Sequence, residues 1–242
     1  MTARRIARPL SVLLAALAVT VTLPGSTLAA AAAPSPCPSG ERLQCIKTRS
    51  ATAVSDRETT LAGLVTIVDK AADLTPSDRT ALLSLLHADE TGLTQLEATI
   101  QADTTVVKAA SDAAKIVTAY RVYVLAVPQV HLVVATDRIG AIDARLHTLS
   151  GKLQAAIEAS RAGSEQKAQA RARLADFDTQ VAAADRDVDG LSSAILSLTP
   201  AGYPGNRTQL GADRDRVNDA RVHLQAARAD AHAILALIKP AT

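Results

Sequence analysis

Residues 170–198 read ARARLADFDTQVAAADRDVDGLSSAILSL, and apolar side chains recur along them at alternating steps of four and three residues. Four heptads of this spacing are typical of a coiled-coil seam, because residues three and four apart share one face of an α-helix. The stretch therefore predicts one long helix with a buried stripe. The stripe consists of Ala170, Leu174, Phe177, Val181, Ala184, Val188, Leu191, Ile195 and Leu198.

The prolines and glycines of residues 199–205 (TPAGYPG) predict a break after this helix, and a second apolar stripe follows over residues 210–238. Each of the two helices is expected to hold about 33 residues and to be about 50 Å long. A short break between long helices favours antiparallel neighbours. We therefore expect an all-α fold, an elongated antiparallel helical bundle with coiled-coil-like long helices in the C-terminal half.

The N-terminal half shows the same periodicity over three shorter segments, which predict helices at about 55–72, 76–100 and 104–120. The sequence Thr75-Pro76-Ser77-Asp78 marks the clearest helix start, with a capping hydroxyl, a proline in the first turn and an acidic residue close behind. The third of these helices is expected to carry one apolar face. That face would consist of Val106, Ala110, Ala113, Val117 and Tyr120.

The segment 120–134 (YRVYVLAVPQVHLVV) departs from the helical pattern. Its β-branched and aromatic residues favour an extended chain, and Pro128 removes a helical hydrogen bond. Either the chain leaves Tyr120 in extended form and restarts as a helix near Pro128, or one long helix kinks there. We favour the first alternative, with residues 121–134 as a buried apolar crossing.

This run, Y-R-V-Y-V-L-x-x-P-Q-V-H-L-V-V, resembles one found in uncharacterised exported helical-bundle proteins of actinobacteria. The resemblance covers about fifteen residues closely and the surrounding helices loosely. It implies an exported helical protein, and it implies no activity, cofactor or catalytic residue.

Residues 1–33 have the three parts of a secretory signal: an arginine-rich start, a short apolar run over residues 10–23 and a small-residue end. The apolar run is shorter than the ~20 residues that a membrane-spanning helix needs. Removing residues 1–33 takes away three of the 26 basic residues and none of the 24 acidic ones, so the mature chain is close to neutral. We therefore expect a secreted protein or one of the extracytoplasmic cell envelope, and a near-neutral chain does not indicate nucleic-acid binding.

Cys37 and Cys45 are the only cysteines, and Pro38, Ser39 and Gly40 between them favour a turn. In an exported chain such a pair predicts a disulfide, and the spacing does not fit a C-x-x-C redox or metal motif. We expect residues 34–54 to form a loop closed by this bond. Residues 55–239 would then form a single helical-bundle domain.

The run Asp185-Arg-Asp187-Val-Asp189-Gly190 matches the first half of a calcium-binding loop. The position that should supply a bidentate glutamate is Leu196, and the apolar stripe continues through the run. A helix would place only Asp185 and Asp189 on one face. We therefore prefer a solvated acidic helix face to a metal site, and we expect no cofactor.

The sequence contains no nucleophile elbow, no phosphate-binding glycine loop and no pair of histidines three or four residues apart. We expect a non-enzymatic protein that acts by contact with an unknown protein partner, or by self-association through its helices. One alternative is a protein that binds membrane surfaces through amphipathic helices, which the narrow stripes and mixed charges disfavour. Another is an enzyme with a site near Tyr120–His131.

Overall fold

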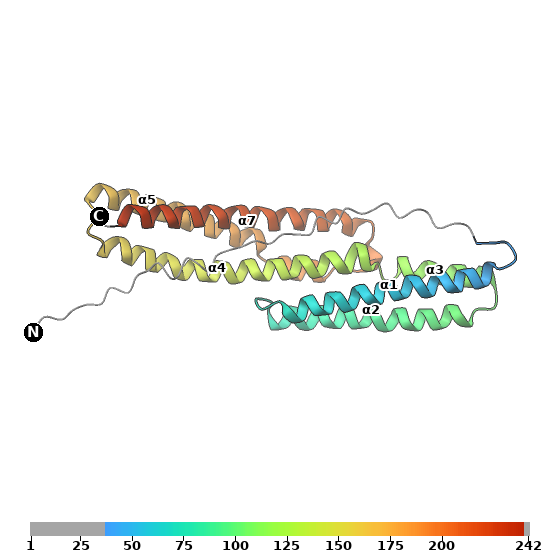
Figure 1. Ribbon diagram of the computed structural model, residues 1–242. Coiled ribbons are helices and arrows are strands. Elements are labelled where there is room, and N and C mark those ends of the chain that lie inside the picture. The colour runs from blue at the N-terminus through green and yellow to red at the C-terminus, as the bar shows by residue number, and fades with distance from the viewer. Residues whose placement is uncertain (1–36, 240–242) are drawn as a thin grey trace, which may run out of the picture. The chain divides into compact units, whose positions relative to one another are not determined.

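The computed structural model describes residues 37–239, and the fold over these residues is all-α, as the sequence predicts. The predicted signal segment, residues 1–33, lies outside the described residues. Figure 1 shows the order of the helices along the chain. They are α1 (Arg42–Lys70), α2 (Pro76–Ala102), α3 (Val106–Thr118), the π-helical turn η2 (Val122–Ala126), α4 (Val127–Ala159), α5 (Ser164–Val188), α6 (Leu191–Leu196), the short 3-10 turn η3 (Pro200–Gly202) and α7 (Gly205–Ile238).

Helices α5 and α7 lie side by side and make the most extensive contact in the fold, and α4 packs against both (Figure 1). Arg173 near the start of α5 pairs with Asp230 near the end of α7, which shows that the two helices are antiparallel. Alanine is frequent at the buried positions of the two helices, and its small side chain allows close approach of the helix axes. These alanines are Ala170, Ala184, Ala220, Ala227 and Ala231.

Helices α1, α2 and α3 pack against one another in the N-terminal half. Lys47 near the start of α1 donates a hydrogen bond of 2.6 Å to the Gln101 carbonyl near the end of α2, so this pair is antiparallel too. Thr75 caps α2 through its side-chain oxygen, which accepts from the Asp78 amide at 3.2 Å, as the local sequence predicts.

The expectation of a loop over residues 34–54 is wrong beyond residue 41. Helix α1 begins at Arg42, so Cys45 lies in its first turn and forms the disulfide with Cys37. Residues 42–54 contain no proline or glycine, and Ser50 and Val54 among them are buried. Packing of these two side chains stabilises the additional turns, so α1 begins more than three turns before the start predicted from the apolar stripe.

Residues 170–198 do not form a single helix. Helix α5 ends at Val188, Gly190 has a left-handed backbone (φ 65°), and α6 starts at Leu191. Arg216 of α7 donates to the carbonyls of Arg186 and Asp189, which the end of α5 leaves without helical partners. The apolar side chains on both sides of the break remain buried, so the periodicity persists although the helix does not. Coiled-coil packing of the long helices stays a prediction.

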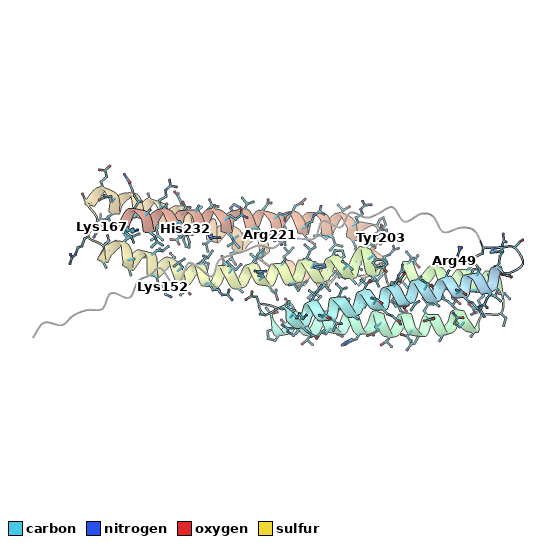
Figure 2. The ribbon with its side chains drawn as sticks, in the orientation of Figure 1. Arg49, Lys152, Lys167, Tyr203, Arg221 and His232 are labelled. Carbon is cyan, nitrogen blue, oxygen red and sulfur yellow. A yellow bond between two sulfur atoms is a disulfide. The ribbon has the colours of Figure 1, made fainter. Side chains whose placement is uncertain are left out.

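The extended chain expected between Tyr120 and Pro128 is wrong, because residues 122–126 form η2, whereas a helix does begin next to Pro128 as expected. The backbone of Arg121 is left-handed, with φ 46°, and η2 then leads directly into α4. Pro128 stands in the first turn of α4, where its missing N–H costs no helical hydrogen bond. The side chain of Arg121 donates to the Pro200 carbonyl at 3.1 Å, and its guanidinium lies 4.0 Å from the ring centre of Tyr203, which Figure 2 labels.

Gln129 is fully buried in α4 and holds the end of α6. Its side-chain amide donates to the carbonyls of Ile195 and Leu198, both at 2.9 Å. Changing Gln129→Ala would remove the side-chain donor to the Leu198 carbonyl, leave the Ile195 carbonyl with only the Leu198 amide as a donor, and open a cavity. We expect the free energy of unfolding, measured by urea denaturation, to fall by about 2–4 kcal/mol. The control Gln169→Ala removes an exposed amide and should change it by under about 0.5 kcal/mol; equal effects of the two changes would contradict this role.

Candidate functional site

An acidic cavity of about 510 Å³ opens where the α1–α2 turn, α4 and the α5–α6 corner meet. Five of its lining residues are aspartates, and no lysine, arginine or histidine lines it. The remaining lining side chains are small or hydroxyl-bearing for the most part. The five aspartates of the acidic cavity are Asp73, Asp78, Asp137, Asp185 and Asp189.

Asp137 of α4 is the best-connected member of the acidic cavity. One carboxyl oxygen accepts from the Thr75 amide at 2.7 Å, and the other accepts from the Ser192 hydroxyl at 3.0 Å. The side chain of Asp78 lines the same cavity. Burial raises the pKa of Asp137 above its usual range and the negative charge of Asp78 adds to the rise, although the two donated hydrogen bonds oppose it.

The other carboxylates around the acidic cavity differ in their partners. Asp73 forms an ion pair of 2.8 Å with Arg145. Asp143 lies farther along α4 and pairs with His147 at 3.2 Å, yet one of its oxygens is buried without a hydrogen-bond partner. Burial raises the pKa of Asp143, and the charge of Asp185 contributes to the rise. This end of the fold therefore holds more negative charge than its cations balance.

The structure separates the three aspartates of the predicted calcium motif. Asp185 and Asp189 line the acidic cavity, whereas Asp187 lies beside α7, with its carboxylate 3.7 Å from His223. Over residues 37–239, no group of three or more His, Cys, Asp or Glu side chains is arranged to hold a metal ion. The motif stands on α5 up to Val188 and lacks the geometry of a calcium loop.

Helix α3 has an exposed apolar surface that the sequence places in the core. Two members of the predicted stripe are turned outward, since Val106 is 37% and Val117 is 53% exposed, while Ala109 and Ile116 are buried instead. Val107, which lies outside that stripe, is 81% exposed. The buried face also contains Asp112, which is neutralised by ion pairs with Lys108 and Lys115. The spacing of apolar residues could not show which face of α3 is buried, because it gives no reason to expect an aspartate there.

This outward surface, which we call the α3 face, consists of Val106, Val107, Ala110, Ala114 and Val117. Six large hydrophobic side chains are exposed among the described residues, and five of them lie between Val106 and Val124. The sixth, Val222, stands alone on α7. Three of the five lie on α3, and the other two, Tyr123 and Val124, lie on η2. Single exposed hydrophobic residues are common, but three on one short helix indicate a contact surface.

One alternative from the sequence is an enzyme site near Tyr120–His131. In the structure, the side chains of this region have different neighbours. Tyr123 is exposed and lies 5.0 Å from the guanidinium of Arg57. The Tyr120 ring packs so closely on Gly92 of α2 that a side chain at Gly92 would collide with it. His131 is half-buried, and burial lowers its pKa. The structure does not bring the tyrosines and His131 together as one site.

Comparisons with known proteins give this chain no relative: no protein-family model, no curated protein and no solved structure matches it. The candidate sites therefore stand on geometry alone. Sequence reasoning missed Asp73, Asp78 and Asp137, because they are distant in sequence and follow no motif. Only the fold brings them together with the end of α5.

Asp89 of α2 provides a test of burial in this half of the fold. Burial raises the pKa of Asp89 to about 6, above its ordinary value of 3.8. A raised pKa in the folded state means that stability present at low pH is lost as the pH rises through about 6. In urea denaturation, Asp89→Asn should therefore raise the free energy of unfolding at pH 7 and leave it nearly unchanged at pH 4. The exposed neighbour variant Glu90→Gln should do neither, and a loss of stability in Asp89→Asn at pH 7 would contradict the inference.

Proposed function

We propose that this is an exported, non-enzymatic protein of the cell envelope or extracellular space, and that it acts through protein–protein contact by the α3 face. The observation that supports it is the concentration of exposed hydrophobic side chains between Val106 and Val124. Covering a valine that water now surrounds releases about 1–2 kcal/mol. The α3 face can therefore drive association without any charged partner.

The surroundings of the α3 face support a protein partner. Lys108, Ser111, Lys115 and Thr118 are exposed on the same helix, so polar groups border the apolar stripe. An apolar centre with a polar border is the usual anatomy of a protein interface. Alanines within the stripe leave room for a partner helix to approach closely.

The export part of the proposal rests on two features. Residues 1–33 carry the sequence pattern of a secretory signal. The disulfide between Cys37 and Cys45 is consistent with an oxidising compartment. The resemblance to exported actinobacterial proteins is in line with both.

Binding to a membrane surface is the second candidate. Among the described residues, one helical stretch within Val106–Ala159 is apolar and long enough to span a membrane by composition and length, and 44% of its most apolar window is buried inside the fold. Core helices of soluble proteins pass the same criterion. The α3 face contains no aromatic or leucine side chain of the kind that anchors helices in lipid, which favours a protein partner.

A site-specific photocrosslinker tests the proposal in the producing cells. Placed at Val107 of the full chain, it should yield adducts of discrete mass with protein, because this side chain would lie inside the interface. Placed at Val222, which is 61% exposed but isolated, it should yield none. Adding Val117→Lys to the Val107 probe should reduce the adduct yield by about tenfold or more.

Two results would contradict the proposal. One is equal adduct formation from Val107 and Val222, which would indicate non-specific contact. The other is co-sedimentation of the purified mature chain with phosphatidylglycerol–phosphatidylethanolamine vesicles that Val117→Lys abolishes, because the α3 face would then bind lipid.

A further inference from the structure

The α3 face has an internal symmetry that bears on the identity of its partner. Its central stripe begins and ends with an exposed valine and has two exposed alanines between them, at steps of three, four and three residues. The stripe consists of Val107, Ala110, Ala114 and Val117. Steps of three and four keep these side chains on one side of the helix, over a length of about 15 Å. The residue types and their spacing are therefore the same when the stripe is read from either end.

A stripe with this symmetry is complementary to a second copy of itself in the antiparallel direction. Antiparallel pairing of two α3 helices places Val107 against the second copy's Val117, and Ala110 against the second copy's Ala114. Each contact then occurs twice, as in an isologous interface. The alanines lie in the middle of the stripe, and their small side chains permit helix axes about 8 Å apart. The antiparallel direction also opposes the two helix macrodipoles, which favours it over parallel pairing.

The charges beside the stripe do not oppose this pairing. The two lysines of α3 are bound to aspartates of the same chain: Lys108 pairs with Asp103 and with Asp112, and Lys115 pairs with Asp112 at 2.6 Å. Two positive charges are thus balanced by two negative charges. A face without net charge does not repel its own copy, and it gives no advantage to a partner of either sign.

We infer that the partner of the α3 face is a second copy of this chain, bound antiparallel through α3 in a two-fold symmetric and reversible dimer. This rests on the proposed function, because both require the α3 face to bind protein. A standard specific interface buries about 800 Å² on each partner, and four short side chains cover less than that. The dimer is therefore weak, with a dissociation constant of about 0.1–1 mM.

Pairs of introduced cysteines test the partner and the direction together. A disulfide requires two Cα atoms about 4.4–6.8 Å apart. In the antiparallel dimer, Val107 lies beside the second copy's Val117 but about 15 Å along the helix from the second copy's Val107. Under mild oxidation, a mixture of Val107→Cys and Val117→Cys chains should therefore give about fivefold more disulfide-linked dimer than either variant alone.

The matched control for the cysteine experiment is Val222→Cys on α7, which is exposed but isolated. Mixed with Val107→Cys, it should give no more linked dimer than Val107→Cys alone. The same mixture measures any exchange of the new thiols with the Cys37–Cys45 disulfide.

Sedimentation equilibrium of the purified mature chain tests the dimer without new thiols. The average mass should rise from one chain towards two between about 10 μM and 1 mM. Val117→Lys places a charge in the stripe and should raise the dissociation constant by about tenfold or more. Val222→Lys should leave it unchanged, and an unchanged far-ultraviolet spectrum shows that both variants are folded.

The outcomes distinguish the dimer from the wider proposal. A chain that stays monomeric at about 1 mM overturns the dimer. So does as much linked product from Val107→Cys alone as from the mixture, because the contact is then not antiparallel. If the photocrosslinker at Val107 still yields adducts with a different protein in the producing cells, the proposed function holds with that protein as the partner. Absence of any protein adduct at Val107 contradicts the proposed function itself, whereas adducts with the mass of two chains support both.

Discussion

The close pairing of α5 with α7 is the constraint on which the rest of the fold depends. Five buried alanines on these helices let the axes approach, and Phe177 is the largest fully buried side chain among the described residues. Helix α4 packs against this pair and supplies Gln129 to the end of α6 and Asp137 to the start of α6. The corner between α5 and α7 therefore has its position set from α4, and the α1–α2 turn is likewise held by α4, through Asp137 and Arg145.

Much of the helical architecture could be predicted from local sequence. The Thr75-Pro76 cap starts α2 as expected, and the break at residues 199–205 separates α6 from α7. The pairing of Cys37 with Cys45 follows from their number and spacing. In each case the cause lies within a few residues of the effect, such as a capping hydroxyl, a proline or a short loop between two thiols.

The errors have causes that the spacing of apolar residues does not report. A left-handed Gly190 ends α5 where the apolar spacing continues, and Arg216 of α7 stabilises the broken end. Helix α3 is rotated relative to the prediction because Lys108 and Lys115 neutralise a buried Asp112. The acidic cavity combines residues from three parts of the chain that share no motif. None of these contacts leaves a trace in hydrophobic periodicity, and so neither candidate surface could be located before the fold was known.

The contact of Arg121 with the corner before α7 has a consequence for the order in which the molecule is completed. Arg121 holds a backbone conformation that side chains other than glycine adopt at a cost, and its guanidinium is bound by the Pro200 carbonyl and the Tyr203 ring. The Pro200 carbonyl lies 79 residues downstream of Arg121, and Tyr203 lies three residues beyond it. While the chain emerges with its N-terminus first, the junction between α3 and α4 has no such clamp until the residues around 200 have followed. The N-terminal helices can form early, but this link to the rest of the molecule is secured only when that later segment is in place.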